Sequence, residues 1–178
     1  MRSWKTLLAW AAIALGVTGV AFAAATATQT VTMQVAAICV LGTTGNPGAL
    51  TVSAPLLGGD PPGDATSNPT YAQYTSTVAA GTTRRLQANW DASDGAPARC
   101  SLLLTATPAN VGNQGASLGQ ITMTSTPTDL VSGIGNCATG RGPTSGAELI
   151  YVLRVDNVDN LVAGESRTVT ITLTLTDN

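Results

Sequence analysis

Residues 167–176, RTVTITLTLT, alternate without a break between threonine and apolar side chains. Val169, Ile171, Leu173 and Leu175 fall on one face of an extended chain, and the threonines between them fall on the other. A period of two residues is typical of a half-buried β-strand. The pattern therefore predicts a final strand whose apolar face lies in the core.

Shorter runs of the same kind recur along the chain between turns rich in Gly, Pro, Asn and Asp, and no long helical periodicity interrupts them. Many short strands at such spacing indicate an all-β fold, and we expect an antiparallel immunoglobulin-like β-sandwich. The expected strands are Ala49–Ala54, Tyr71–Ala79, Arg84–Trp90, Cys100–Thr107, Ser117–Ser125 and Leu149–Val155, and the expected large loops are Leu56–Pro69 and Ser125–Gly146.

The segment Thr28–Leu41, TQTVTMQVAAICVL, predicts an unusually long first strand. Its first half places Val31, Met33 and Val35 on one face, whereas both faces are apolar from Val35 onward, as in a strand covered on two sides. Such a strand would span about 46 Å, against roughly 17–20 Å for ordinary strands. We therefore expect the alternating half to pair outside its own domain.

The N-terminus has the layout of a secretory signal. Arg2 and Lys5 precede an apolar run, and Ala21-Phe22-Ala23 forms a small-x-small cleavage site. We expect cleavage after Ala23, a secreted protein at the cell surface, and no membrane contact afterwards. An uncleaved anchor over Leu7–Ala27 stays open as an alternative.

Removal of residues 1–23 from the 178 leaves 155 residues with 6 basic and 10 acidic side chains. That length predicts one domain with its own core. The net charge of −4 disfavours nucleic acid as a partner. With only 10% charged residues in the whole chain, little charge repulsion opposes self-association.

Three cysteines can form at most one bridge within a chain. We expect it between Cys100 and Cys137, because Cys137 lies in a Gly-rich stretch too long to be loose in a compact domain. Cys39 is then unpaired. Its apolar neighbours favour a buried, inert thiol over a bridge between subunits.

The absence of certain residues restricts catalysis. The chain has no histidine, and Lys5 is its only lysine, so that the mature protein could not build a Ser-His or Ser-Lys site. Gly115-Ala116-Ser117-Leu118-Gly119 matches a nucleophile elbow, but a turn leading into a strand explains it better. Glu148 and Glu165, the only glutamates, show no sign of a shared cleft. We expect no enzyme and no cofactor.

Metal and sugar sites find weak support. The loop pairs Asp60/Asp64, Asp91/Asp94 and Asp156/Asp159 could offer oxygens to calcium, but ordinary turn chemistry explains them, and we assign no metal site. Tyr71, Tyr74 and Trp90 could stack on a glycan, although core packing better accounts for Trp90.

Together, the signal ending at Ala23, the Thr-rich alternation over Ala24–Val35, the sandwich-like middle and the Thr-alternating last strand resemble filament subunits joined by donor-strand complementation. Such subunits include chaperone-usher-type pilins and the biofilm-matrix fibre proteins and bundling pilins of bacteria and archaea. The resemblance implies that residues 24–36 are a donor strand, inserting Val31, Met33 and Val35 into a neighbour, and that residues 37–178 form the sandwich. Cys39 departs from a donor segment, so the boundary is placed before it.

The expected function is a structural subunit of an extracellular filament or pilus used in adhesion or biofilm. Its partners would be copies of itself, with a cell-surface or glycan target left open. The alternative is a monomeric secreted sandwich that binds a glycan or protein, in which Thr28–Val35 pairs within its own sheet.

Overall fold

The structure, a computed structural model, describes residues 28–55, 57–91, 93, 95–109, 111–159 and 161–178. The expected signal at 1–23 and residues 24–27 of the expected donor segment lie outside the described residues. The chain divides into the part before Val35 and a unit that runs from Val35 to Asn178. Among the described residues, no helix is long and apolar enough to cross a membrane.

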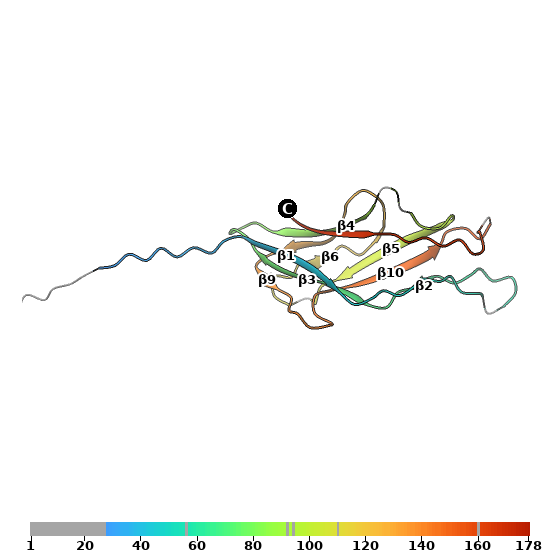
Figure 1. Ribbon diagram of the computed structural model, residues 1–178, viewed down its shortest axis with the longest axis horizontal. Coiled ribbons are helices and arrows are strands. Elements are labelled where there is room, and N and C mark those ends of the chain that lie inside the picture. Colours follow the sequence, from blue (N-terminus) through green and yellow to red (C-terminus); the bar gives the residue numbers. More distant parts are fainter. Residues whose placement is uncertain (1–27, 56, 92, 94, 110, 160) are drawn as a thin grey trace, which may run out of the picture. The chain divides into compact units, whose positions relative to one another are not determined.

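The described residues form an all-β protein made of antiparallel sheets (Figure 1). The larger sheet has the order β1-β3-β10-β5-β7, with β2 paired to β10 and β9 paired to β3, and the smaller has the order β11-β4-β8-β6. The strands are β1 Ile38–Thr44, β2 Ala65–Thr66, β3 Thr70–Thr77, β4 Arg84–Trp90, β5 Cys100–Thr107, β6 Ala116–Ser117, β7 Gln120–Thr122, β8 Thr128–Ile134, β9 Cys137–Ala138, β10 Ala147–Val155 and β11 Ile171–Asp177.

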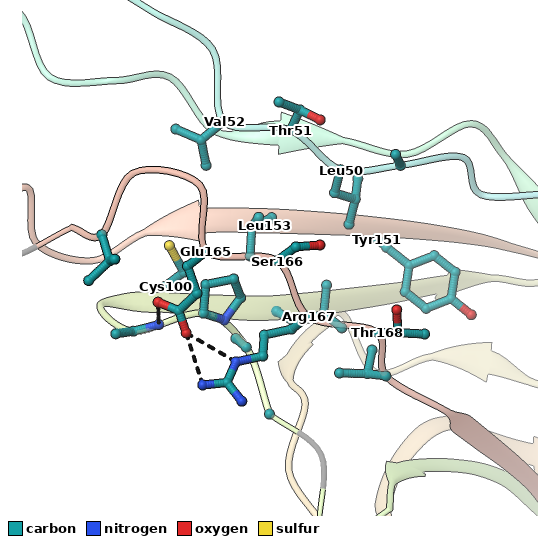
Figure 2. A pocket seen from close by; sticks show the side chains of 18 of the residues that line it. Leu50, Thr51, Val52, Cys100, Tyr151, Leu153, Glu165, Ser166, Arg167 and Thr168 are labelled. Atoms are coloured by element: carbon teal, nitrogen blue, oxygen red, sulfur yellow. Dashed lines mark hydrogen bonds and ion pairs between the residues drawn. The ribbon is translucent and has the colours of Figure 1, made fainter.

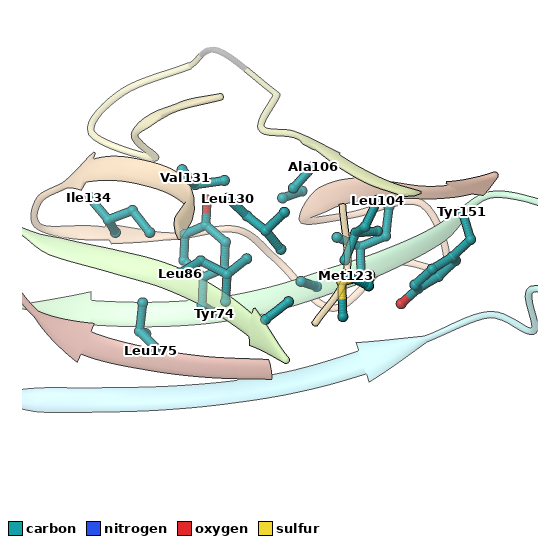
Figure 3. Close-up of a cluster of buried hydrophobic side chains, with 14 of the residues drawn as sticks. Tyr74, Leu86, Leu104, Ala106, Met123, Leu130, Val131, Ile134, Tyr151 and Leu175 are labelled. Carbon is teal, nitrogen blue, oxygen red and sulfur yellow. The ribbon is translucent and has the colours of Figure 1, made fainter. Parts of the chain in front are cut away.

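The two sheets share one hydrophobic core (Figure 3). Tyr74 and Leu104 enter it from the larger sheet, and Leu86, Leu130 and Leu175 enter it from the smaller. Along β3 and β4, buried and half-buried residues alternate, as expected for strands with one face on the core. The Tyr74 hydroxyl donates a hydrogen bond to the carbonyl of Gln114 at 2.6 Å, so this buried phenol is satisfied.

Sequence alternation located several of these strands well. The bounds of β4 and β5 are those predicted, and β3 and β10 agree with the prediction to within two residues. The last strand also keeps its apolar face toward the core, although regular pairing begins only at Ile171. Predicted strand Ser117–Ser125 corresponds to two short strands, β6 and β7.

The expected large loop at Ser125–Gly146 is wrong, because it contains the seven-residue strand β8. Leu130 and Val131 are adjacent in sequence and both buried, which breaks the period of two. The cause is a register shift in the pairing of β8 with β4, typical of a β-bulge. In the expected loop at Leu56–Pro69, the part that the structure describes, from Leu57 onward, contains one named strand, the two-residue β2.

Candidate assembly site

The N-terminal arm, defined as Thr28–Ala37, contains no strand. Regular pairing starts at Ile38, the first residue of β1. The prediction of one continuous strand over Thr28–Leu41 is therefore wrong for the arm, which belongs to no named strand of the described residues. The apolar residues of the arm are largely exposed: Val31 by 67%, Met33 by 88% and Val35 by 84%.

The expected cover on both faces after Val35 is also absent. Ile38 and Val40 are 41% and 59% exposed, whereas Leu41 packs against the core. The reason is that β1 is the edge strand of the larger sheet, and only its inner face meets the other sheet. The outer face of β1, which carries Ile38 and Val40, is therefore exposed.

The edge strands of the two sheets, β1 and β11, meet at one end and diverge at the other. Near the start of β1, the Cys39 thiol donates to the carbonyl of Leu175 at 3.4 Å. Beyond Thr44 the chain leaves the sheet, and β11 begins only at Ile171. Between these two segments the core is left open.

This opening is a groove of about 1030 Å³, shown in Figure 2. Its floor is formed by Leu102 of β5 and by Tyr151 and Leu153 of β10. One rim is the segment Pro47–Val52 and the other is the segment Leu161–Ile171. The lining is largely apolar, with Leu50, Val52, Val169 and Ile171 half-buried at the rims.

Both rims have strand-like sequences that lie outside the strands. The predicted strand Ala49–Ala54 is wrong, since its only pairing is a single bridge between Ser53 and Gly63. On the other rim, residues 167–170 continue the alternation of β11 but belong to no strand. Along that alternating face Leu175 is buried, whereas Leu173, Ile171 and Val169 are only partly buried. The apolar face is thus less completely covered on the groove side of Leu175.

The second rim is held in place by a carboxylate. Glu165 accepts a hydrogen bond from the backbone N–H of Ala98 at 3.2 Å and pairs with Arg167 at 3.0 Å (Figure 2). The hydrogen bond from Ala98 links the segment before β11 to the turn before β5, and the ion pair lies within that segment.

The expected bridge between Cys100 and Cys137 is incompatible with the fold. All three cysteines are free thiols. Ala72 of β3 and Ala147 of β10 are paired and give a common reference point. Cys137 pairs with Ser76, four residues from Ala72 along β3. Cys100 pairs with Val155, eight residues from Ala147 along β10, and this displacement runs in the opposite direction. The two sites are thus about 40 Å apart along the strands, and a disulfide needs Cα atoms within about 7 Å.

The cysteines also differ in environment. Cys39 is exposed, which corrects the expectation of a buried thiol. Burial raises the pKa of Cys137, and burial followed by repulsion from Asp156, Glu165 and Asp64 raises the pKa of Cys100. A raised pKa keeps a thiol protonated at neutral pH, so neither position offers an activated nucleophile.

The nucleophile-elbow match lies in an ordinary turn and short strand. Ser117 ends β6, and its hydroxyl accepts a hydrogen bond from the N–H of Gly119 at 3.2 Å. Gly115 has a φ of +90°, and a Cβ there would lie 2.6 Å from the carbonyl oxygen of Ser132. Backbone packing thus explains this glycine. The two glutamates are separated, because Glu148 pairs with Thr107 in the sheet and Glu165 lies at the groove rim.

The residues considered for calcium and sugar binding have other roles. Asp91 accepts hydrogen bonds from the N–H and hydroxyl of Ser93, which lower its pKa, and Asp94 lies outside the described residues. Among the described residues, no group of three His, Cys, Asp or Glu side chains could hold a metal ion. Tyr71 and Tyr74 are three residues apart on β3 and so point to opposite faces, which separates the expected aromatic platform.

Comparisons with protein-family models, with curated proteins and with solved structures found no match. The functional argument therefore depends on two features of this chain, the exposed arm and the apolar groove.

Proposed function

We propose that this protein is a structural subunit of an extracellular filament or pilus, assembled by donor-strand complementation and serving adhesion or biofilm. The protein would be exported through its N-terminal signal. Its two sheets would form an immunoglobulin-like sandwich that lacks one strand. The observation that carries the proposal is that one chain has both an exposed arm with alternating apolar residues and an apolar groove whose two rims have strand-like sequences.

The arm has the spacing that the groove requires. In extended chain, Val31, Met33 and Val35 project to one side at intervals of about 7 Å. Entering between the rims, they would cover the apolar floor around Leu102 and Leu153. The arm backbone could pair with a rim segment, which is the β-strand addition known for peptide recognition.

The arm that fills a groove belongs to a second copy of the chain. Ile38 pairs with Thr77 on β3, and Thr70, seven residues away on the same strand, pairs with Leu149 of β10. Leu153 lies four residues further along β10 in the same direction, so the two points are separated by the length of eleven residues. The start of β1 is thus about 36 Å from that part of the groove. A chain from Ile38 reaches at most about 10 Å at Val35 and about 25 Å at Val31. Its own arm cannot place these three side chains around Leu153.

The direction of this exchange makes the assembly open-ended. β1 starts at one end of the domain, and the groove lies beyond its other end. Each subunit would give its arm to one neighbour and accept the arm of another. Such head-to-tail contacts between unlike surfaces produce filaments unless the rotation closes a ring.

The groove also leaves room for the alternative function, a monomeric secreted protein that binds a glycan or another protein. Its volume of about 1030 Å³ is at the upper end for ligand sites, which are typically about 300–1,000 Å³. The exposed arm would then have no role, which favours the filament. Binding of soluble glycans by a protein that stays monomeric would favour the alternative.

The direct test is electron microscopy of the natively secreted protein. We expect filaments, and size-exclusion chromatography should show polymers that persist on dilution. A wild type that stays strictly monomeric at high concentration would contradict the filament.

A further inference from the structure

We propose that Thr77 and Arg84 form an anchor that fixes the root of the arm to both sheets, so that tension entering through the arm does not detach β1. The inference rests on the proposed filament for the source of the tension. The anchor itself is a property of the single domain. It involves neither the groove nor the arm side chains proposed to enter it.

The first half of the anchor is one hydroxyl on β3. Thr77 Oγ1 accepts a hydrogen bond from the N–H of Ile38 at 2.6 Å and donates one to the carbonyl of Ala36 at 2.9 Å. A single side chain thus holds the last part of the arm and the first residue of β1. These bonds lie at the exposed surface, where the backbone groups could otherwise bond to water.

The second half is a buried guanidinium from the other sheet. The side chain of Arg84 on β4 is only 7% exposed. One of its terminal nitrogens donates to the carbonyl of Ile38 and to the hydroxyl of Ser76, and its Nε donates to Asp177 at 2.8 Å. It therefore connects β1 and β3 of the larger sheet with β4 and β11 of the smaller.

General stability is a poor explanation for this arginine. Burying a charge is expensive, and the carboxylate that pairs with this guanidinium, Asp177, is 81% exposed, so that the ion pair itself contributes little stability. An apolar side chain could fill the end of the core next to Leu86 and Leu175, but it could not hold the carbonyl of Ile38. The distinctive contribution of Arg84 is the hydrogen bond to the first residue of β1.

Tension makes that contact useful. Among the strands that the structure describes, β1 lies at the edge of its sheet and pairs with β3 alone. If the arm is held by another subunit, force enters β1 at Ile38. It then acts first on the backbone pairs between β1 and β3 nearest to Ile38. Bonds from Thr77 and Arg84 to this residue spread the force to strands of both sheets.

The test compares Thr77→Val and Arg84→Met with the control Thr75→Val. Thr75 is two residues away on the same face of β3, and its pairing partner Val40 also lies in β1. Hydrogen–deuterium exchange of the β1 amides would be measured in a Val31→Asp/Val35→Asp background, designed to stay monomeric. We expect exchange about fivefold faster with Thr77→Val, more than tenfold faster with Arg84→Met, and unchanged with the control.

Single-molecule pulling on polymers of the same variants, with wild-type arms, gives the second readout. We expect Thr77→Val and Arg84→Met to assemble as the wild type does but to rupture at lower force, through detachment of β1. Unchanged exchange of the β1 amides in both variants would overturn the anchor, and unchanged rupture force would overturn its role under tension. If the wild type forms no polymers, the proposed filament fails, and the exchange measurement still decides whether the anchor holds β1.

Discussion

Replacing Val31 and Val35 together by aspartate should abolish polymers and leave the domain folded. Both side chains are largely exposed in the single chain, so the change removes no contact within the core. In a polymer they would be buried, and burial contributes about 1.5–3 kcal/mol for each such side chain. The three apolar residues of the arm would thus contribute roughly 4.5–9 kcal/mol.

That contribution is only comparable with the cost of association, which is estimated at about 4–15 kcal/mol. Losing two of the three side chains removes about 3–6 kcal/mol, which corresponds to more than a hundredfold loss of affinity. Burying two unpaired carboxylates would cost several kcal/mol more. The remaining backbone pairing should therefore be too weak to hold subunits together.

The assay is size-exclusion chromatography with light scattering, combined with circular dichroism and thermal unfolding. The double variant should elute as a monomer with a wild-type β-sheet spectrum and melting temperature. A matched control is Val111→Asp/Val158→Asp, which places the same charges at valines that are 59% and 47% exposed and do not line the groove. This control should polymerise normally.

Two results would refute the reasoning. A double variant that polymerises as the wild type does would show that the arm is not the donor. A double variant that unfolds would show that Val31 and Val35 are buried in their own domain, as in the self-paired alternative.

Two further predictions concern the groove and the thiols. Val169→Asp places a charge at a half-buried rim residue of the groove, so this variant should donate its arm but accept none. Mixed with the Val31→Asp/Val35→Asp variant, it should give one-to-one dimers by light scattering. Polymers formed by Val169→Asp alone would exclude this groove as the acceptor. Alkylation of the native protein near neutral pH should label the exposed Cys39 before Cys100 and Cys137. Labelling of Cys100 and Cys137 should increase as the pH rises toward their raised pKa values. Non-reducing peptide mapping that joins Cys100 to Cys137 would contradict the fold.

Local alternation was enough to place β4, because one face of this strand lies on the core and the other is only half-buried, and Arg84–Trp90 could be delimited to the residue. Cys100–Thr107 does not alternate, since Leu102, Leu103 and Leu104 are all buried, but its apolar run between turns delimited it equally well. β8 escaped prediction because its bulge puts Leu130 and Val131 on the core together. The cysteine pairing was wrong because the distance between two cysteines depends on strand order and register, which loop composition does not reveal.

The remaining errors in the strand predictions have a common location. Thr28–Ala37, Ala49–Ala54 and residues 167–170 have strand-like sequences, yet none of them lies in a named strand of the single chain. The last two form the rims of the groove, and the first is the arm proposed to enter it. Local sequence preference and the fold of a single chain normally agree, and they are expected to disagree at functional sites. Adding an arm from a second copy between the rims would place a further extended segment beside both of them, so that their strand-like sequences would lie in or next to regular strands in the polymer.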